Sequence, residues 1–219
     1  MESIFFLAMT LCALFSFAFG LRWYFGKKVP LYAVMIIFGS GCAMLGRMFE
    51  TMLLLIRHEL QSGFNVGLLG IMGSFMFFLA ANYGTMDSLV DDGSRGVMKY
   101  RLIALAAPAG ILVLYYFFLT RVGFGIDAIV NGVLVLVIML ASYYHLKHLI
   151  IPDVEDGIIR HIRLYNLLAL VYALLCMNEM TFEVIRIAAV WRYILYTAFC
   201  IVYVLFVPAL YRGVKRWTI

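Results

Sequence analysis

The chain alternates long apolar runs with short polar breaks, and this pattern predicts its elements. A helix needs about 20 mostly apolar residues to cross a bilayer. Seven runs are long enough, and they cover residues 3–25, 31–56, 66–89, 101–120, 124–149, 160–184 and 188–211. Glycine, proline and charged residues occupy most of the breaks, as expected of loops. The pattern therefore predicts an all-α integral membrane protein, with residues 1–219 forming a single seven-transmembrane-helix bundle.

Composition supports this fold class. The chain is 65% hydrophobic and 13% charged, with a mean hydropathy of +1.00, whereas a soluble domain carries about 25% charged residues. The net charge of +5 does not indicate nucleic-acid binding, because the basic residues are spread over alternate loops. We expect the lipid bilayer, and no nucleic acid, to be a partner of this chain.

The basic residues favour one orientation. Twelve of them lie on one side of the predicted bundle: Arg22, Lys27, Lys28, Arg95, Lys99, Arg101, Lys147, Arg160, Arg163, Arg212, Lys215 and Arg216. Four lie on the other side: Arg57, Arg121, Arg186 and Arg192. Because Lys and Arg accumulate in cytoplasmic loops, we expect the N-terminus outside and the C-terminus in the cytoplasm of a cell membrane. The first run follows Glu2 and precedes three of these basic residues, the opposite of a signal peptide, so we expect it to be a retained span.

An odd number of spans permits a repeat of three-plus-one-plus-three type, with the fourth span as a linker. The topology resembles that of microbial rhodopsins. However, all five lysines lie in predicted loops or the tail, so no retinal Schiff base is expected, and we expect no cofactor. The layout is also similar to that of small sugar-transporting carriers, but their Pro-Gln loop motif is missing.

Charged residues inside the spans identify the first candidate site. A charge within the bilayer is costly, so it faces the bundle interior, where it pairs or lines a wet cavity. Arg47 and Glu50 lie one turn apart in the second span, and Glu179 lies at matching depth in the sixth. The sequence predicts an outward-facing cavity for a small polar or zwitterionic ligand, lined by Arg47, Glu50, Asp127, Asn131, Asn178, Glu179, Glu183 and Arg192. The alternative is an Arg47 ion pair with Glu179 or Glu50 that only fixes helix packing.

A second polar group lies at the predicted cytoplasmic ends of the spans. Its members are Asp87, Asp91, Asp92, His145, His148, Asp153, Glu155, Asp156 and His161. His145 and His148 share a helix face, which is one spacing that zinc accepts. Because no HExxH motif occurs and these side chains are inexpensive at a water interface, we favour a solvated loop and expect no metal. Asn82 and Asn166, in the inner half, are expected to bridge helices.

Small residues predict close helix contacts. They lie in the second span between Gly39 and Gly46, and in the third at Gly70, Gly73 and Ser74. Four cysteines lie inside spans without CxxC spacing, at Cys12, Cys42, Cys176 and Cys200, so we expect free thiols. Pro108 and Pro208 fall within spans, where proline kinks helices.

Two classes of function fit these features. In the first, the protein is a receptor or sensor that binds a ligand in the outer cavity and signals through a cytoplasmic or membrane partner. In the second, it is a small-solute transporter of the three-plus-one-plus-three type. A third hypothesis, metal-dependent lipid hydrolysis, has much less support than these two, so we do not expect an enzyme. The central turns of the fifth and seventh spans, 132–140 and 199–206, carry no charge. This apolar midplane favours a pocket that opens to one side of the membrane only.

Overall fold

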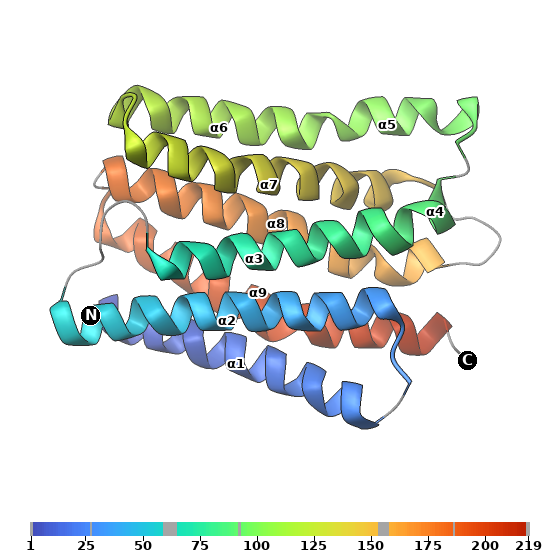
Figure 1. The fold of residues 1–219 in the computed structure, drawn as a ribbon, viewed down its shortest axis with the longest axis horizontal. Coiled ribbons are helices and arrows are strands. Elements are labelled where there is room, and N and C mark those ends of the chain that lie inside the picture. The colour runs from blue at the N-terminus through green and yellow to red at the C-terminus, as the bar shows by residue number, and fades with distance from the viewer. Residues whose placement is uncertain are drawn as a thin grey trace.

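A computed structural model describes residues 2–26, 28–58, 65–91, 93–152, 158–185 and 187–217. Within these ranges the chain forms helices and no strand. Seven helices there are long and apolar enough to cross a membrane, by length and composition. The predicted all-α class and number of spans are therefore confirmed, and the fold indicates a multi-pass membrane protein (Figure 1).

Five spans are single helices: α1 (Glu2–Gly26), α2 (Leu31–Arg57), α7 (Ile126–Ile150), α8 (Ile158–Ile185) and α9 (Ala189–Trp217). The third span, Val66–Met86, combines α3 (Val66–Ala81) and the π-helical turn η1 (Asn82–Met86), and the short helix α4 (Asp87–Val90) follows it. The fourth combines the 3-10 turn η2 (Arg95–Val97), α5 (Met98–Ala104) and α6 (Ala106–Val122).

Proline explains the break in the fourth span. Pro108 has no N–H for the carbonyl of Ala104, and its ring crowds that carbonyl. Accordingly, α5 ends at Ala104 and α6 begins at Ala106. The second predicted proline site behaves differently, because α9 runs without interruption through Pro208.

Six spans form a closed ring. In order around it, α1 packs on α2, α2 on α3, α3 on α7, α7 on α8, α8 on α9, and α9 on α1. The remaining span lies outside this ring, where α6 packs against α7 and α8 at one edge of the bundle (Figure 1). Side chains from α1, α2, α3, α8 and α9 line a common small cavity inside this ring.

Glycines permit a close contact in the ring between α2 and α3. A Cβ atom added at Gly46 would lie 2.7 Å from the Gly67 carbonyl oxygen, and one added at Gly70 would lie 2.6 Å from Gly46 Cα. Neither position has room for a larger side chain. The predicted close packing of these two spans is therefore confirmed.

Aromatic side chains fill the middle of the ring. Phe75 stacks on Tyr172 with ring centroids 4.9 Å apart, and Phe206 contacts Phe78 at 4.9 Å and Tyr165 at 5.2 Å. A cavity of about 10 Å³ lies beside this layer. It is lined by Ala13, Ser16, Ser40, Ala43, Phe78, Tyr172, Val202, Tyr203 and Phe206. A volume of this size holds about one water molecule.

The outside of the bundle is apolar. Large hydrophobic side chains such as Leu11, Leu55, Leu112 and Leu136 are exposed there, as expected of a surface that faces lipid. All four cysteines are free, as predicted.

Candidate functional site

Arg47 is the centre of a group made of Arg47, Glu50, Glu179 and Tyr203. We call it the outer charge cluster, after the orientation predicted from the basic residues. Arg47 Nη1 donates to Glu50 Oε2 at 2.9 Å and to Glu179 Oε1 at 2.7 Å. Its Nη2 donates to Glu179 Oε2 at 2.6 Å, and its Nε donates to Tyr203 Oη at 3.0 Å. The cluster thus joins α2, α8 and α9, and both ion pairs weighed from the sequence are formed.

The cluster is closed around its cation. Arg47 is only 1% exposed, and its guanidinium lies 4.5 Å from the ring centroid of Phe199, a distance at which cation–π attraction operates. The side chains of Glu50 and Glu179 are each 14% exposed. The carboxylates, and not the guanidinium, are the part of the cluster nearest to solvent.

Three other predicted residues lie apart from this cluster. Asn131 and Asn178 donate to backbone carbonyls of their own helices, those of Asp127 at 2.9 Å and Leu174 at 2.7 Å. The Asp127 side chain is exposed at the start of α7. Among the described residues, none of the three side chains makes a hydrogen bond or ion pair with Arg47.

Arg192 takes a different partner. It forms an ion pair with Glu2 of α1, where both side chains are about one third exposed. Glu183 lies in α8, but its side chain is outside the described part of the structure. Of the eight predicted residues, the structure therefore brings together Arg47, Glu50 and Glu179.

Hydroxyl groups continue from this cluster towards the bundle centre. Tyr203 Oη lies 3.5 Å from Tyr172 Oη, which in turn lies 3.5 Å from Ser74 Oγ. Both tyrosines are buried, and both line the small cavity. Contacts of 3.5 Å are long for O–H···O hydrogen bonds, so this connection is weak in the observed state.

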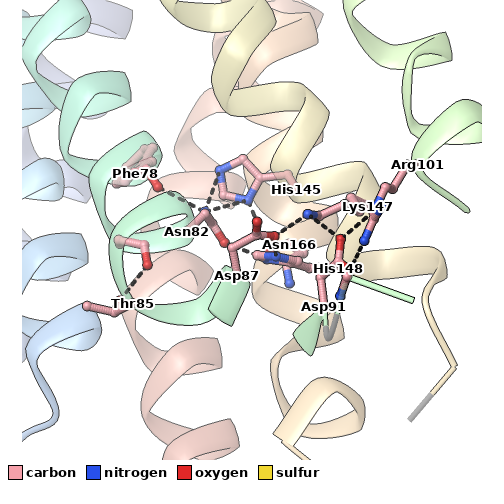
Figure 2. Close-up of polar contacts among 12 residues, drawn as sticks. Phe78, Asn82, Thr85, Asp87, Asp91, Arg101, His145, Lys147, His148 and Asn166 are labelled. Atoms are coloured by element: carbon pink, nitrogen blue, oxygen red, sulfur yellow. Dashed lines mark hydrogen bonds and ion pairs between the residues drawn. The ribbon is translucent and has the colours of Figure 1, made fainter. Parts of the chain in front are cut away.

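A second buried group, which we call the histidine cluster, consists of Asn82, Asp87, His145, His148 and Asn166 (Figure 2). The prediction that His145 and His148 lie in a solvated loop is wrong, since both are 0% exposed. The reason is packing: α7 continues to Ile150 and is enclosed by α3, α4, α5, α6 and α8. The shared face of the two histidines therefore points into the bundle.

Hydrogen bonds orient every member of the histidine cluster. Asn82 Nδ2 donates to the Phe78 carbonyl at 2.9 Å, and Asn82 Oδ1 lies 2.9 Å from His148 Nδ1. The other nitrogen of His148, Nε2, lies 3.2 Å from Asp87 Oδ1. His145 Nδ1 lies 2.9 Å from Asn166 Oδ1. The expectation that Asn82 and Asn166 bridge helices is confirmed.

Charged residues close one edge of this cluster, as Figure 2 shows. Lys147, which is buried, forms ion pairs with Asp87 and with Asp91. Arg101 Nε donates to Asp91 Oδ2 at 2.7 Å, and a second guanidinium nitrogen reaches Asp91 Oδ1. The Arg101 hydrogen bond holds the pKa of Asp91 well below its ordinary value, against the opposing effect of burial. Burial raises the pKa of Asp87, but hydrogen bonds from His148 and Lys147 outweigh it and lower that pKa.

The histidines are not arranged as metal ligands. Within the described ranges, no group of three or more His, Cys, Asp or Glu side chains could hold a metal ion. His161 lies on α8 and is partly exposed. The other acids considered from the sequence, Asp92, Asp153, Glu155 and Asp156, lie outside the described residues.

Two residues of these clusters were not identified from the sequence as members of a candidate site. Lys147 was assigned to a loop, although its position in α7, between His145 and His148, puts it within reach of the acids that follow α3. Tyr203 lies in the central turns of the seventh span, 199–206, and in the structure it is a direct partner of Arg47. Burial of a tyrosine hydroxyl usually requires such a partner.

Comparisons of this chain with protein-family models, curated proteins and solved structures find no match.

Proposed function

We propose that this protein is a seven-helix membrane receptor or sensor. In this proposal the ligand is a small molecule with a cationic group, it binds at the outer charge cluster, and binding is reported to a cytoplasmic or membrane partner. One observation carries the proposal: Arg47 joins α2 to α8 through Glu179, and its third partner, Tyr203, packs against Tyr172 of the aromatic layer.

Charge supports the class of ligand. Two carboxylates, Glu50 and Glu179, share one guanidinium, so the cluster carries −2 + 1 = −1 when all three groups are ionised. The partly exposed carboxylates are also the first groups that an approaching molecule meets. An ammonium group would neutralise the excess charge, and a zwitterion would in addition offer a carboxylate to Arg47. We infer an amine or a zwitterion of amino-acid size.

The linked helices support a signalling role. A ligand that competes for Glu179 would weaken the α2–α8 connection, and a ligand shifts an equilibrium only through such a differential contact. α8 carries Glu179 near one end and Asn166, a partner of His145, thirteen residues before it. At 1.5 Å per residue these positions are about 20 Å apart along one helix. Movement of α8 would therefore reach the histidine cluster.

The filled centre of the bundle favours a sensor over a carrier that moves a solute across the membrane. Phe78, Tyr172, Tyr203 and Phe206 fill the region inward of the outer charge cluster, and the cavity beside them has a volume of about 10 Å³. An amino-acid-sized solute has no room there in the observed state. Binding from one side requires no such path, whereas a carrier must expose its site to both sides in turn.

A carrier is the second candidate, and one feature of the packing favours it. The triplets α1–α3 and α7–α9 make equivalent contacts: the middle helix of each packs on both neighbours, and α1 on α9 is matched by α7 on α3. A three-plus-one-plus-three repeat has this pattern, with the peripheral fourth span as linker. In this alternative, Arg47 and Glu179 would act as a gate between the two middle helices.

Ligand-induced stabilisation tests the proposal. Purified protein would be heated with a panel of the twenty amino acids, betaine and simple amines, because a ligand that binds the folded state raises the midpoint of unfolding. We expect at least one amine or zwitterion to stabilise the protein, and Glu179→Gln to remove that effect. Asn178→Ala is the matched control, since Asn178 bonds only its own helix.

Vesicles then separate the two candidates. The stabilising compound, radiolabelled, is offered to sealed vesicles that contain the protein. Saturable binding without accumulation supports the sensor, whereas accumulation driven by a sodium or proton gradient supports the carrier. Absence of any stabilising amine or zwitterion would contradict the proposed ligand class.

A further inference from the structure

His148 lies with both ring nitrogens beside hydrogen-bond acceptors. Asn82 Nδ2 donates to the Phe78 carbonyl at 2.9 Å, and this contact fixes the orientation of the amide. Asn82 Oδ1 therefore faces His148 Nδ1 at 2.9 Å, and Nδ1 must carry a hydrogen. The second nitrogen, Nε2, lies 3.2 Å from Asp87 Oδ1.

A neutral imidazole has only one N–H group. When Nδ1 carries it, the lone pair of Nε2 faces a carboxylate oxygen, and that contact is repulsive unless another proton lies between the two atoms. From this geometry we propose that His148 and Asp87 form a proton-binding site, with one exchangeable proton held between Nε2 and Oδ1.

The charged groups around this site cancel one another, so the fraction of molecules that hold the proton can change with pH. Asp87 and Asp91 contribute −2, Lys147 and Arg101 contribute +2, and their sum is zero. The bound proton therefore changes the cluster from neutral to +1. Among groups on α7, His145 is engaged by Asn166, and the Tyr144 ring lies 6.3 Å from the His148 ring.

Of the other elements packed on α7, α5 carries Arg101, already counted, and Lys99, whose Nζ lies 4.9 Å from the Tyr100 ring centroid. α3 has no charged residue, and α6 has only Arg121, at its opposite end. The inner end of α8 carries Arg160, His161 and Arg163. Arg163 donates to the Ile151 carbonyl at 3.4 Å.

Inside the cluster, Asn166 Nδ2 is buried and has no hydrogen-bond partner among the described residues, so the site has an unused donor.

Proton binding between His148 and Asp87 is linked to the π-helical turn η1. The two partners of His148, Asn82 and Asp87, flank the π-helical turn: η1 begins at Asn82, and the Asp87 N–H donates to the Asn82 carbonyl. Single π-helical turns occur frequently at functional sites. Loss of the proton removes one of the two contacts by which His148 holds this turn against α7. The site therefore connects cytoplasmic pH to the conformation of the third span.

Histidine NMR in lipid nanodiscs tests the site directly. The chain has four histidines, so ¹⁵N-histidine labelling with a His148→Gln variant assigns the His148 signals. Asp87→Asn removes the negative partner, so His148 should lose its proton at a pH about one unit lower or more. Lys147→Met removes a competing cation, so the same titration should move to higher pH. His161→Gln should change neither.

The opposite directions of the two shifts make the test decisive. If Asp87→Asn prevents folding, Lys147→Met alone decides the question. A His148 titration at the same pH in all variants would overturn the proposal. It would also be overturned by a ring that stays neutral while Asp87 stays ionised between pH 5 and 9, because no proton would then be shared.

Discussion

Arg47 on α2 donates two parallel hydrogen bonds to the carboxylate of Glu179 on α8, at 2.7 and 2.6 Å. This fork-to-fork geometry is available to arginine and not to lysine. The third edge of the guanidinium, Nε, is occupied by Tyr203 at 3.0 Å. Arg47 therefore fixes the relative position of three helices, and its removal should affect all of them.

Replacement of Arg47 by methionine should destabilise the protein. The substitution leaves Glu50 and Glu179 without their cation, and breaking a buried ion pair from one side costs about 3–5 kcal/mol, somewhat less in a membrane. Arg47→Met with Glu179→Gln should recover part of the loss, and Glu50→Gln as a third change should recover more. Thermal unfolding in detergent measures each step. A double variant no more stable than Arg47→Met would show that Arg47 and Glu179 are not coupled.

Glycine substitutions test the contact between α2 and α3. Gly70→Ala places a methyl group 2.6 Å from Gly46 Cα, which is a backbone atom and cannot move aside, so we expect a loss of about 1–3 kcal/mol. Gly73→Ala is the matched control on the same helix. Its methyl group would lie 3.4 Å from Cys42 Sγ, an ordinary contact, and the change should be neutral or slightly stabilising. Equal thermal stability of the two variants would contradict the observed packing.

His145→Ala and His148→Ala should each destabilise the protein. Because both rings are buried and hydrogen-bonded, each change leaves polar groups unpaired, and each such group costs about 1–3 kcal/mol. The partly exposed His161 provides the control, and His161→Ala should have a small effect. Thermal unfolding again gives the measurement, and wild-type stability in His148→Ala would contradict the burial described above.

Much of this fold was predictable because bilayer physics acts on single residues. Arg47 and Glu179 were placed at matching depth, either lining a cavity or with Glu179 as one of two alternative ion-pair partners, since a charge in lipid has few alternatives to a partner at its own depth. The glycines around Gly46 and Gly70 were expected to pack closely for a similarly local reason.

The site was less predictable, because its geometry depends on which helices are neighbours. His145 and His148 look like interface residues near a helix end, and only the enclosure of α7 by α3, α4, α5, α6 and α8 buries them. Arg192 was predicted to line the same cavity as Arg47, but the contact between α1 and α9 gives it Glu2 as a partner. The arrangement of all six ring helices decides which helices are neighbours, and this arrangement cannot be predicted from the sequence of any single span.

Reporter fusions should establish the orientation predicted from the basic residues. A periplasmic or extracellular reporter at the N-terminus and a cytoplasmic reporter after Ile219 should both be active. The expectation rests on the twelve basic residues on one side against four on the other. Two reporters on the same side of the membrane would exclude an odd number of spans. An inverted result would place the outer charge cluster at the cytoplasm.

Asp91 should give the protein a stability component that is lost in acid. Arg101 donates to its Oδ2 at 2.7 Å, Gly93 N–H donates to its Oδ1 at 3.1 Å, and Lys147 donates to Oδ2 at 3.1 Å. The hydrogen bond from Arg101 is the largest influence, and together these donors lower the pKa of Asp91 below its ordinary 3.8 despite partial burial.

The sign of this effect follows from proton linkage. Because the folded state holds the carboxylate ionised at a pH where the unfolded chain takes up a proton, the stabilisation is complete above the ordinary pKa. It declines as the pH falls below about 4 towards the lower pKa of the folded state. Asp91→Asn should therefore be less stable than the wild type between pH 5 and 7, and the difference should narrow below pH 4. Asp127→Asn, at the exposed opposite end of α7, is the control. Thermal unfolding from pH 7 to pH 3 measures both variants, and a constant difference across that range would show that Asp91 contributes through packing and not through its charge.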